Sequence, residues 1–316
     1  MTRSSHKYLL ILAGLLGTAA QAEVFILPSG EQVVGAAGQV PAAHEDTLTD
    51  IGRRHGLGYE EMRLANPGVD PWLPGEGATV TLPTRFVLPD TPRRGVVINL
   101  AEYRMYYYHS ADGVSRVSTF PISIGRMDWN TPLGRASITA KTRNPAWYPP
   151  ASIREEYAAE GRSLPSVVPA GPDNPLGEYA LRLSVPGYLI HGTNRPAGVG
   201  MRVTHGCIRM FPEDIEWLFP QVGVKTSVRL VNQPVKLGWS GQSLLLEVHP
   251  PLGEDEAGRE KGMTFITERY VELTSERPAE VDWDLVEAVY REQRGVPVEV
   301  GLATGIAPAV AARVTD

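Results

Sequence analysis

The chain is poor in cysteine, because its 316 residues include only Cys207. A single thiol cannot form a disulfide within the chain, and it excludes metal motifs built on paired cysteines. In an exported protein a lone thiol is exposed to oxidation and mixed disulfides. Two explanations remain open, a buried inert side chain or a reactive group, and the residues around Cys207 must decide between them.

Long apolar runs are also missing beyond the first residues. Arg3 and Lys7 precede a short apolar stretch over residues 8–16, and a small-x-small sequence ends at Ala22. This pattern predicts a signal peptide over residues 1–22 that is cleaved after Ala22, with an uncleaved anchor as the alternative. We therefore expect an exported protein with no integral membrane segment in its mature form.

Basic charge is not in excess. The 30 lysines and arginines are outnumbered by 36 acidic residues, which gives a net charge of −6. Nucleic acid is therefore not expected as a partner, because phosphate binding normally needs a basic surface.

Proline and glycine are abundant, and they favour short strands and loops. Residues 38–83 are predicted to form a strand–helix–helix–strand unit that ends its second helix at Asn66. Its sequence, "EDTLTDIGRRHGLGYEEMRLANPGVDPWLPGEGATVTLP", resembles a LysM domain. The resemblance implies binding to the glycan strands of the cell wall, and a structural spacer of the same shape is the alternative.

From residue 94 the sequence has a β character. Closely spaced strands are typical of a closed or sandwiched β architecture. We place strands at 96–100, 104–108, 117–124, 136–141, 179–183 and 188–191, and a helix at 212–219. The C-terminal extension, 233–316, is predicted to hold a strand at 264–267, a helix at 282–292 and a disordered end.

The chemistry is concentrated in "YLIHGTNRPAGVGMRVTHGCIRMFPEDIEWLF". A thiol reacts as the thiolate, so Cys207 needs a neighbouring base. His191 is the favoured base because it ends an apolar strand, and Gly192 leaves a carbonyl that can orient the ring. His205 is the alternative base, since Cys207 follows it by two residues and both can face one side of an extended chain.

Other residues near the thiol are expected to support it. Backbone N–H groups at His205, Gly206 and Cys207 are candidates for stabilising an oxyanion. Arg209 suits a carboxylate, with a structural salt bridge as the alternative. A zinc site of His191, His205 and Cys207 is disfavoured because no fourth ligand is apparent. The remaining predicted substrate-binding residues are Tyr188, Thr193, Asn194 and Thr204.

These residues carry a family resemblance. "IHGTN" followed by "THGCIRM" resembles the signature of the L,D-transpeptidase (YkuD) catalytic domain over residues 94–232. The resemblance implies a mainly β, sandwich-like domain, with Cys207 as nucleophile, His191 as acid/base and no cofactor. It is closest to a periplasmic subgroup that combines this domain with LysM.

The implied reaction is attack of Cys207 on the L-centre carbonyl of diaminopimelate in a tetrapeptide stem. D-Ala leaves, and the thioester passes to an amine, either a second peptidoglycan stem or the C-terminal lysine of an outer-membrane lipoprotein. An L,D-carboxypeptidase or hydrolase and a non-catalytic wall-binding protein are the alternatives.

Overall fold

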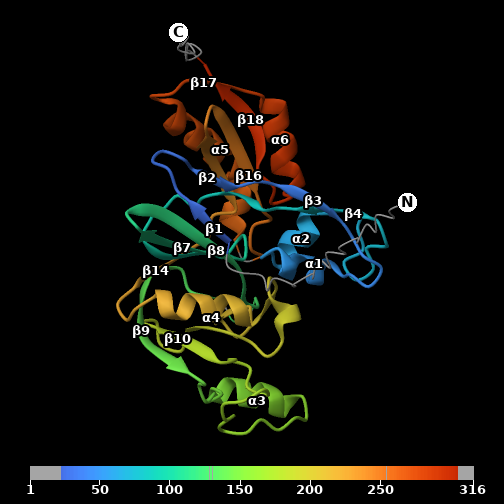
Figure 1. Ribbon diagram of the computed structural model, residues 1–316, viewed down its shortest axis with the longest axis vertical. Helices are drawn as coiled ribbons and strands as arrows, with labels where there is room; N and C mark the ends of the chain where they lie inside the picture. The colour runs from blue at the N-terminus through green and yellow to red at the C-terminus, as the bar shows by residue number, and fades with distance from the viewer. Residues whose placement is uncertain (1–22, 128, 130, 254, 305–316) are drawn as a thin grey trace, which may run out of the picture.

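The computed structural model describes residues 23–127, 129, 131–253 and 255–304. The predicted signal peptide and residues 305–316 of the expected disordered end lie outside these ranges. A closed β structure occupies the middle of the molecule, with helices packed around it (Figure 1). No helix in the described ranges has the length and apolar character to cross a bilayer.

Eight strands pair in a ring, so the sheet closes into a barrel and the fold is mixed α/β. The predicted sandwich is wrong on this point. Closure depends on the longest strand. Its residues 114–121 pair with one neighbour, and its opposite edge pairs with two other strands. In ring order the strands are β8 (Val114–Gly125), β13 (Ile208–Met210), β11 (Leu189–His191), β10 (Tyr179–Leu183), β9 (Gly134–Arg143), β14 (Ser227–Val231), β6 (Gly95–Asn99) and β7 (Arg104–Ala111).

The interior of the barrel is filled by alternate apolar side chains of its strands. Ile122 and Ile124 of β8 are buried together with Ile190 of β11 and Ile208 of β13. Helix α4 (Pro212–Gln221) adds Ile215, Leu218 and Phe219 to the same core. Because successive residues of a strand face opposite sides, this inward set directs the residues between them outward.

The predicted strand–helix–helix–strand arrangement is present near the N-terminus. It consists of β3 (Gly38–Pro41), α1 (Leu48–Arg54), α2 (Tyr59–Ala65) and β4 (Thr79–Leu82), with β3 and β4 antiparallel. Thr47 caps α1 through a capping box with Asp50. Two short two-strand ladders thus frame this part of the chain, β3–β4 and β2 (Val33–Gly35) with β5 (Arg85–Val87).

This N-terminal unit shares its core with the barrel. Leu48, Met62 and Val80 pack in one cluster with Val97 and Tyr106 of the barrel strands. Charged contacts join the same parts: Arg104 of β7 binds Glu61 at 2.5 Å, and Arg53 binds Glu213 of α4 at 2.8 Å. The unit is therefore held on the barrel by both apolar and ionic contacts.

The C-terminal part forms a second sheet, which was not predicted from the sequence. Its strands run in the order β15 (Val235–Ser240), β16 (Ser243–Val248), β18 (Val298–Ala303) and β17 (Ala279–Val281). Helices α5 (Glu256–Thr274) and α6 (Trp283–Glu292) cover it. The helix predicted at 282–292 is confirmed, and Asp282 caps it.

The strand predicted at 264–267 is wrong, because these residues lie inside α5. Their β-branched and aromatic content favours a strand over four residues. The pattern over a longer window is helical, since Met263, Ile266, Tyr270 and Leu273 pack on the sheet at three- and four-residue intervals.

A buried charged cluster joins this C-terminal sheet to the barrel. Lys236 of β15 contacts Glu102, in the turn after β6, and lies 2.8 Å from Glu247. His249 is 2.6 Å from Glu247. Among the described residues, Glu102, Glu247 and His249 are the one group spaced as metal ligands. The Lys236 ammonium group contacts both carboxylates, and His249 contacts Glu247, so we interpret the cluster as a structural ion-pair network.

Candidate active site

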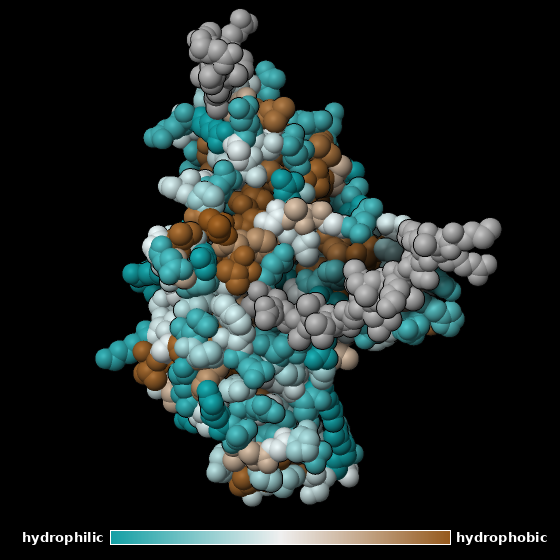
Figure 2. Space-filling model, viewed as in Figure 1, coloured by the Kyte–Doolittle hydropathy of each residue, from teal (hydrophilic) through white to brown (hydrophobic). Residues whose placement is uncertain are grey.

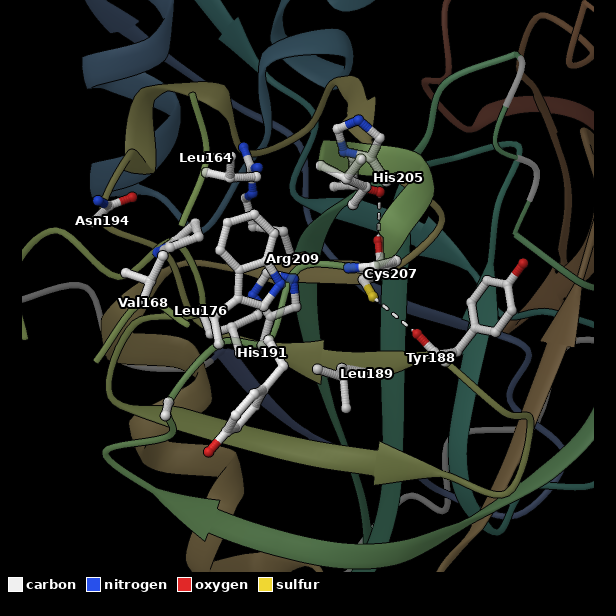
Figure 3. Close-up of a pocket in the computed structure, with 18 of the residues that line it drawn as sticks. Leu164, Val168, Leu176, Tyr188, Leu189, His191, Asn194, His205, Cys207 and Arg209 are labelled. Carbon is white, nitrogen blue, oxygen red and sulfur yellow. Dashed lines mark hydrogen bonds between the residues drawn. The ribbon is translucent and has the colours of Figure 1, made fainter. Parts of the chain in front are cut away.

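A pocket of about 910 Å3 opens on the outer face of the barrel. Strands β11 and β13 form one wall, and the long connection between β9 and β10, which carries α3 (Ala151–Ala159), forms the opposite one. Asn174 fixes this connection by donating to the carbonyls of Pro145 (2.8 Å) and Pro169 (3.0 Å). Figure 3 shows side chains from both walls meeting in the pocket.

The predicted pair of Cys207 and His191 lies in this pocket. β11 and β13 are parallel neighbours, with His191 level with Arg209 and Ile190 level with Ile208. Since both isoleucines face the core, Cys207, Arg209 and His191 face the pocket together. Strand geometry puts the Cα atoms of Cys207 and His191 about 8 Å apart, so a side-chain rotation can bring the thiol and the ring into contact.

The Cys207 thiol is half-buried, and its hydrogen-bond partner is a backbone carbonyl. Sγ donates to the carbonyl of Gly187 at 3.7 Å, and the described residues show no hydrogen bond between the thiol and the imidazole. Burial raises the pKa of Cys207 above its ordinary value of 9.0, against smaller opposing effects of the Leu189 N–H and the Arg209 charge. The resting thiol is therefore protonated.

His191 is buried and neutral. Burial, and then the positive charge of Arg209, lower its pKa to about 4, although the carbonyls of Gly192 and Leu176 favour the charged ring. Nδ1 lies 2.6 Å from the Gly192 carbonyl oxygen. A neutral ring must place its proton on Nδ1 to make this bond, which leaves Nε2 free to accept a proton. This contact fits the prediction that the Gly192 carbonyl orients the His191 ring.

His205 lines the pocket but does not face the thiol as an extended chain would place it. Gly206 has a φ of +95°, so the chain turns between His205 and Cys207. The expectation that both side chains share one face is therefore wrong. His205 Nε2 lies 2.9 Å from Glu156 of α3, which also binds Arg126 at 2.5 Å.

The predicted residues around the pair divide into two groups. Tyr188, Asn194, Thr204 and Arg209 line the pocket, whereas Thr193, Gly192 and Gly206 do not. Thr204 donates to the Cys207 carbonyl at 2.6 Å, and Thr193 accepts from the Arg195 N–H at 2.9 Å, so both hold the local backbone. Gly206 is required, because a Cβ there would lie 2.8 Å from Tyr188. A zinc site from His191, His205 and Cys207 has no support among the described residues.

The opposite wall of the pocket was not predicted from the sequence. Trp147, Tyr157 and Arg162 line it from the β9–β10 connection, and Arg195 lines it from the loop after β11. Glu156 was also missed as the partner of His205. The "WYPPAS" and "IREEY" segments offered proline and aromatic residues but no chemical motif.

A thiol and an imidazole that line one pocket fit the class of cysteine-dependent acyl-transfer enzymes. Comparison with known proteins gives the particular family. The family model described as the L,D-transpeptidase catalytic domain, YkuD, matches residues 93–230. The chain belongs to the L,D-transpeptidase family, whose members are cysteine-dependent acyl transferases.

Two relatives, at 40% and 41% identity, agree with this assignment. The chain is 40% identical over 280 residues to the probable L,D-transpeptidase YcfS of Escherichia coli K12, with 86% of each chain covered. It is 41% identical over 286 residues to the probable L,D-transpeptidase ErfK/SrfK of Salmonella typhimurium, covering 86% of this chain and 89% of the relative. Among solved structures, the catalytic domain of the E. faecium L,D-transpeptidase is 20% identical, with a TM-score of 0.34 and 45% of this chain and 99% of that chain covered.

Proposed function

We propose that the pocket is the active site of a peptidoglycan L,D-transpeptidase in which Cys207 is the nucleophile and His191 the acid/base. The donor is a tetrapeptide stem, attacked at the carbonyl on the L-centre of diaminopimelate. The observation that carries the proposal is the placement of Cys207 and His191 on one face of adjacent parallel strands at the pocket. The family of the chain supports the same chemistry.

The first half-reaction begins when the thiol turns from the Gly187 carbonyl toward His191. Nε2 takes the proton as Sγ attacks, and backbone N–H groups of residues 205–207 are the candidates to stabilise the oxyanion. The C–N bond of the leaving D-Ala then breaks, and its nitrogen takes the proton from His191. A thioester on Cys207 remains.

The second half-reaction transfers the acyl group to an amine. His191 removes a proton from the incoming nitrogen, which attacks the thioester, and the thiol is released as the new amide forms. A diaminopimelate amine of a second stem gives a 3–3 cross-link. The C-terminal lysine of an outer-membrane lipoprotein gives an anchored protein. Water gives the hydrolase alternative.

The test uses purified protein and tetrapeptide muropeptides, with mass spectrometry of the products. Cys207→Ala is expected to abolish D-Ala release. His191→Gln is expected to lower the rate by about 100- to 10,000-fold, the range for a lost general base. His205→Gln is the matched control and should lose less, because His205 binds Glu156.

Incubation with and without an amine acceptor separates the outcomes. New amide products that need the acceptor support transpeptidation, and a shortened stem alone supports hydrolysis. D-Ala release by Cys207→Ala would overturn the nucleophile assignment. Adding muropeptides and a lipoprotein peptide together identifies the preferred acceptor.

We further propose that residues 38–83 bind glycan strands and that the mature protein works in the periplasm after removal of residues 1–22. The support for glycan binding is an exposed aromatic surface, where Tyr59 stacks on Trp72 at 5.8 Å beside Leu73, which is 76% exposed. Trp72→Ala should weaken sedimentation with purified sacculi, whereas Trp283→Ala, an exposed tryptophan on α6, should not. Detection of the protein in a periplasmic fraction with Glu23 as its first residue tests the location.

A further inference from the structure

Arg209 is a half-buried cation that forms no ion pair with a carboxylate of the described residues. Its side chain is half-buried beside Cys207 and His191, its Nε has no hydrogen-bond partner, and it forms no ion pair within the described ranges. Arg195 is close enough to lower the pKa of Arg209 further, after the larger effect of burial. An uncompensated charge in such a place is costly, and an anionic ligand would offset that cost.

The pocket as a whole favours an anion. Four arginines line it, Arg162, Arg182, Arg195 and Arg209, against one acidic residue, Asp173. Arg162 is already paired with Glu160 at 2.9 Å, so the excess comes from the other three. This local excess is opposite in sign to the net charge of −6 of the whole chain. On the face shown in Figure 2, the surface over α3 and α4 is mainly hydrophilic.

The position of Arg209 relative to His191 indicates which carboxylate it meets. An imidazole that returns a proton to the leaving nitrogen must lie on the leaving-group side of the scissile bond. Arg209 is the direct cross-strand neighbour of His191. In a chain-terminal leaving residue the carboxylate is two bonds from that nitrogen, within about 2.5 Å by standard backbone dimensions. The other carboxylates of a stem peptide lie further away along flexible chains.

We propose that Arg209, assisted by Arg195, binds the free carboxylate of the leaving residue and so selects donor stems in which that residue is the last. This inference rests on the proposed function. A guanidinium group suits the task because it can bind a carboxylate through two parallel hydrogen bonds. A stem with one more residue after the leaving position would present an amide to Arg209 and leave its charge unpaired.

The first test compares two synthetic tetrapeptide donors that differ only in a free or an amidated C-terminus. The wild-type protein is expected to prefer the free acid by about 10- to 100-fold in kcat/KM, the range for a lost charge-assisted hydrogen bond. Arg209→Gln should bring this ratio close to one, and Arg195→Gln should reduce it less. Arg229→Gln is the control, because it removes the same charge from β14, across the barrel from β13.

The second test does not depend on transpeptidation. Cys207 is alkylated with iodoacetate and with iodoacetamide, and the ratio of the two rates is measured. An effect of Arg209 on the thiol pKa alters both rates equally, so the ratio reports on anion binding alone. Arg209→Gln should lower the iodoacetate-to-iodoacetamide ratio, and Arg229→Gln should not.

The two tests separate the possible failures. An altered alkylation ratio without any D-Ala release would keep the anion site and overturn the proposed function. Release of D-Ala with equal rates for acid and amide donors in the wild type would overturn the role of Arg209 and keep the proposed function. A ratio for Arg209→Lys that equals the wild-type value would show that charge alone, without the planar fork, accounts for the selectivity.

Discussion

The resting state of the Cys207–His191 pair can be tested by titration. The thiol has a pKa above 9.0, and the imidazole has a pKa of about 4. Both shifts follow mainly from burial, which penalises the charged form of each group. A proton transfer from Sγ to Nε2 in the free enzyme is therefore uphill, and the pair is expected to rest as a neutral thiol and a neutral imidazole.

The magnitude follows from the separation of the two pKa values. At least five pH units between them correspond to about 7 kcal/mol against the thiolate–imidazolium pair. Coulomb attraction between the two charges at about 4 Å returns about 4 kcal/mol at an effective dielectric constant of about 20. The remaining cost of about 3 kcal/mol leaves the ion pair at roughly 1% or less of the resting enzyme.

The assay is the rate of Cys207 alkylation by iodoacetamide between about pH 4 and pH 11. Because the thiolate is the reactive form, we expect one rising curve with its midpoint above pH 9 and no plateau of high reactivity at low pH. His191→Gln should keep this midpoint, since the ring does not hold the thiol proton at rest. Cys207→Ala gives the background.

An alkylation rate that reaches its full value with a midpoint below about pH 7 would refute the reasoning, because it would indicate a preformed thiolate–imidazolium pair. If His191→Gln then lost this reactivity at low pH, the lowered pKa of the thiol would be due to the imidazole. Either result would mean that burial is a smaller effect than the structure indicates.

Three further predictions concern the surroundings of the site. Glu156→Gln should weaken the contact with His205 and lower the rate of Cys207 acylation, with little change in the melting temperature. A fall in melting temperature large enough to account for the lost rate would show a purely structural role. Glu61→Ala should cost about 3–5 kcal/mol in denaturant unfolding by leaving Arg104 buried without its partner, and Glu61→Ala with Arg104→Met should recover part of it. Burial and the neighbouring Glu213 carboxylate raise the pKa of Asp214 to about 8. The folded state therefore holds this proton more tightly than the unfolded chain does. As a result, the free energy of unfolding falls as pH rises from about 4 to about 8. Asp214→Asn should therefore raise the melting temperature at pH 8 and leave it nearly unchanged at pH 4; a uniform change would contradict the shift.

The shared location of Cys207 and His191 was predictable from the sequence because its signal is local. A histidine at the end of an apolar strand and a glycine beside the only cysteine are visible in the printed order of residues. The strand that ends at His191 was predicted at 188–191 and lies at Leu189–His191, whereas β13, which directly follows Cys207, was not predicted. The direction of His205 was not predictable. It depends on the turn at Gly206, and a glycine in the sequence permits a positive φ without requiring one.

The closure of the barrel was hidden for a different reason. It results from the pairing of β8 with β7 on one edge and with β13 on the other, and β13 lies more than eighty residues further along the chain. Strand periodicity shows which face of a strand is buried but not which strands pair. Likewise, the four-residue window at 264–267 lacked the length that separates a strand from a helix, and its true period appeared only over α5 as a whole.

The N-terminal unit takes part in holding the site, although the family match begins after it. The first turn of α2 donates from Tyr59 to the carbonyl of Val199 at 3.2 Å and from Glu60 to the carbonyl of Gly200 at 3.3 Å. These carbonyls belong to the loop that connects His191 to Cys207. Its ends are fixed by the pairing of β11 with β13, and α2 fixes its middle, which lowers the freedom of the segment that carries the thiol. Gly200 packs against this helix start with no room for a Cβ, so a larger residue at this position would push the loop away from the helix. A contact of residues 38–83 with the cell wall would thus involve a unit that is hydrogen-bonded to the loop preceding Cys207.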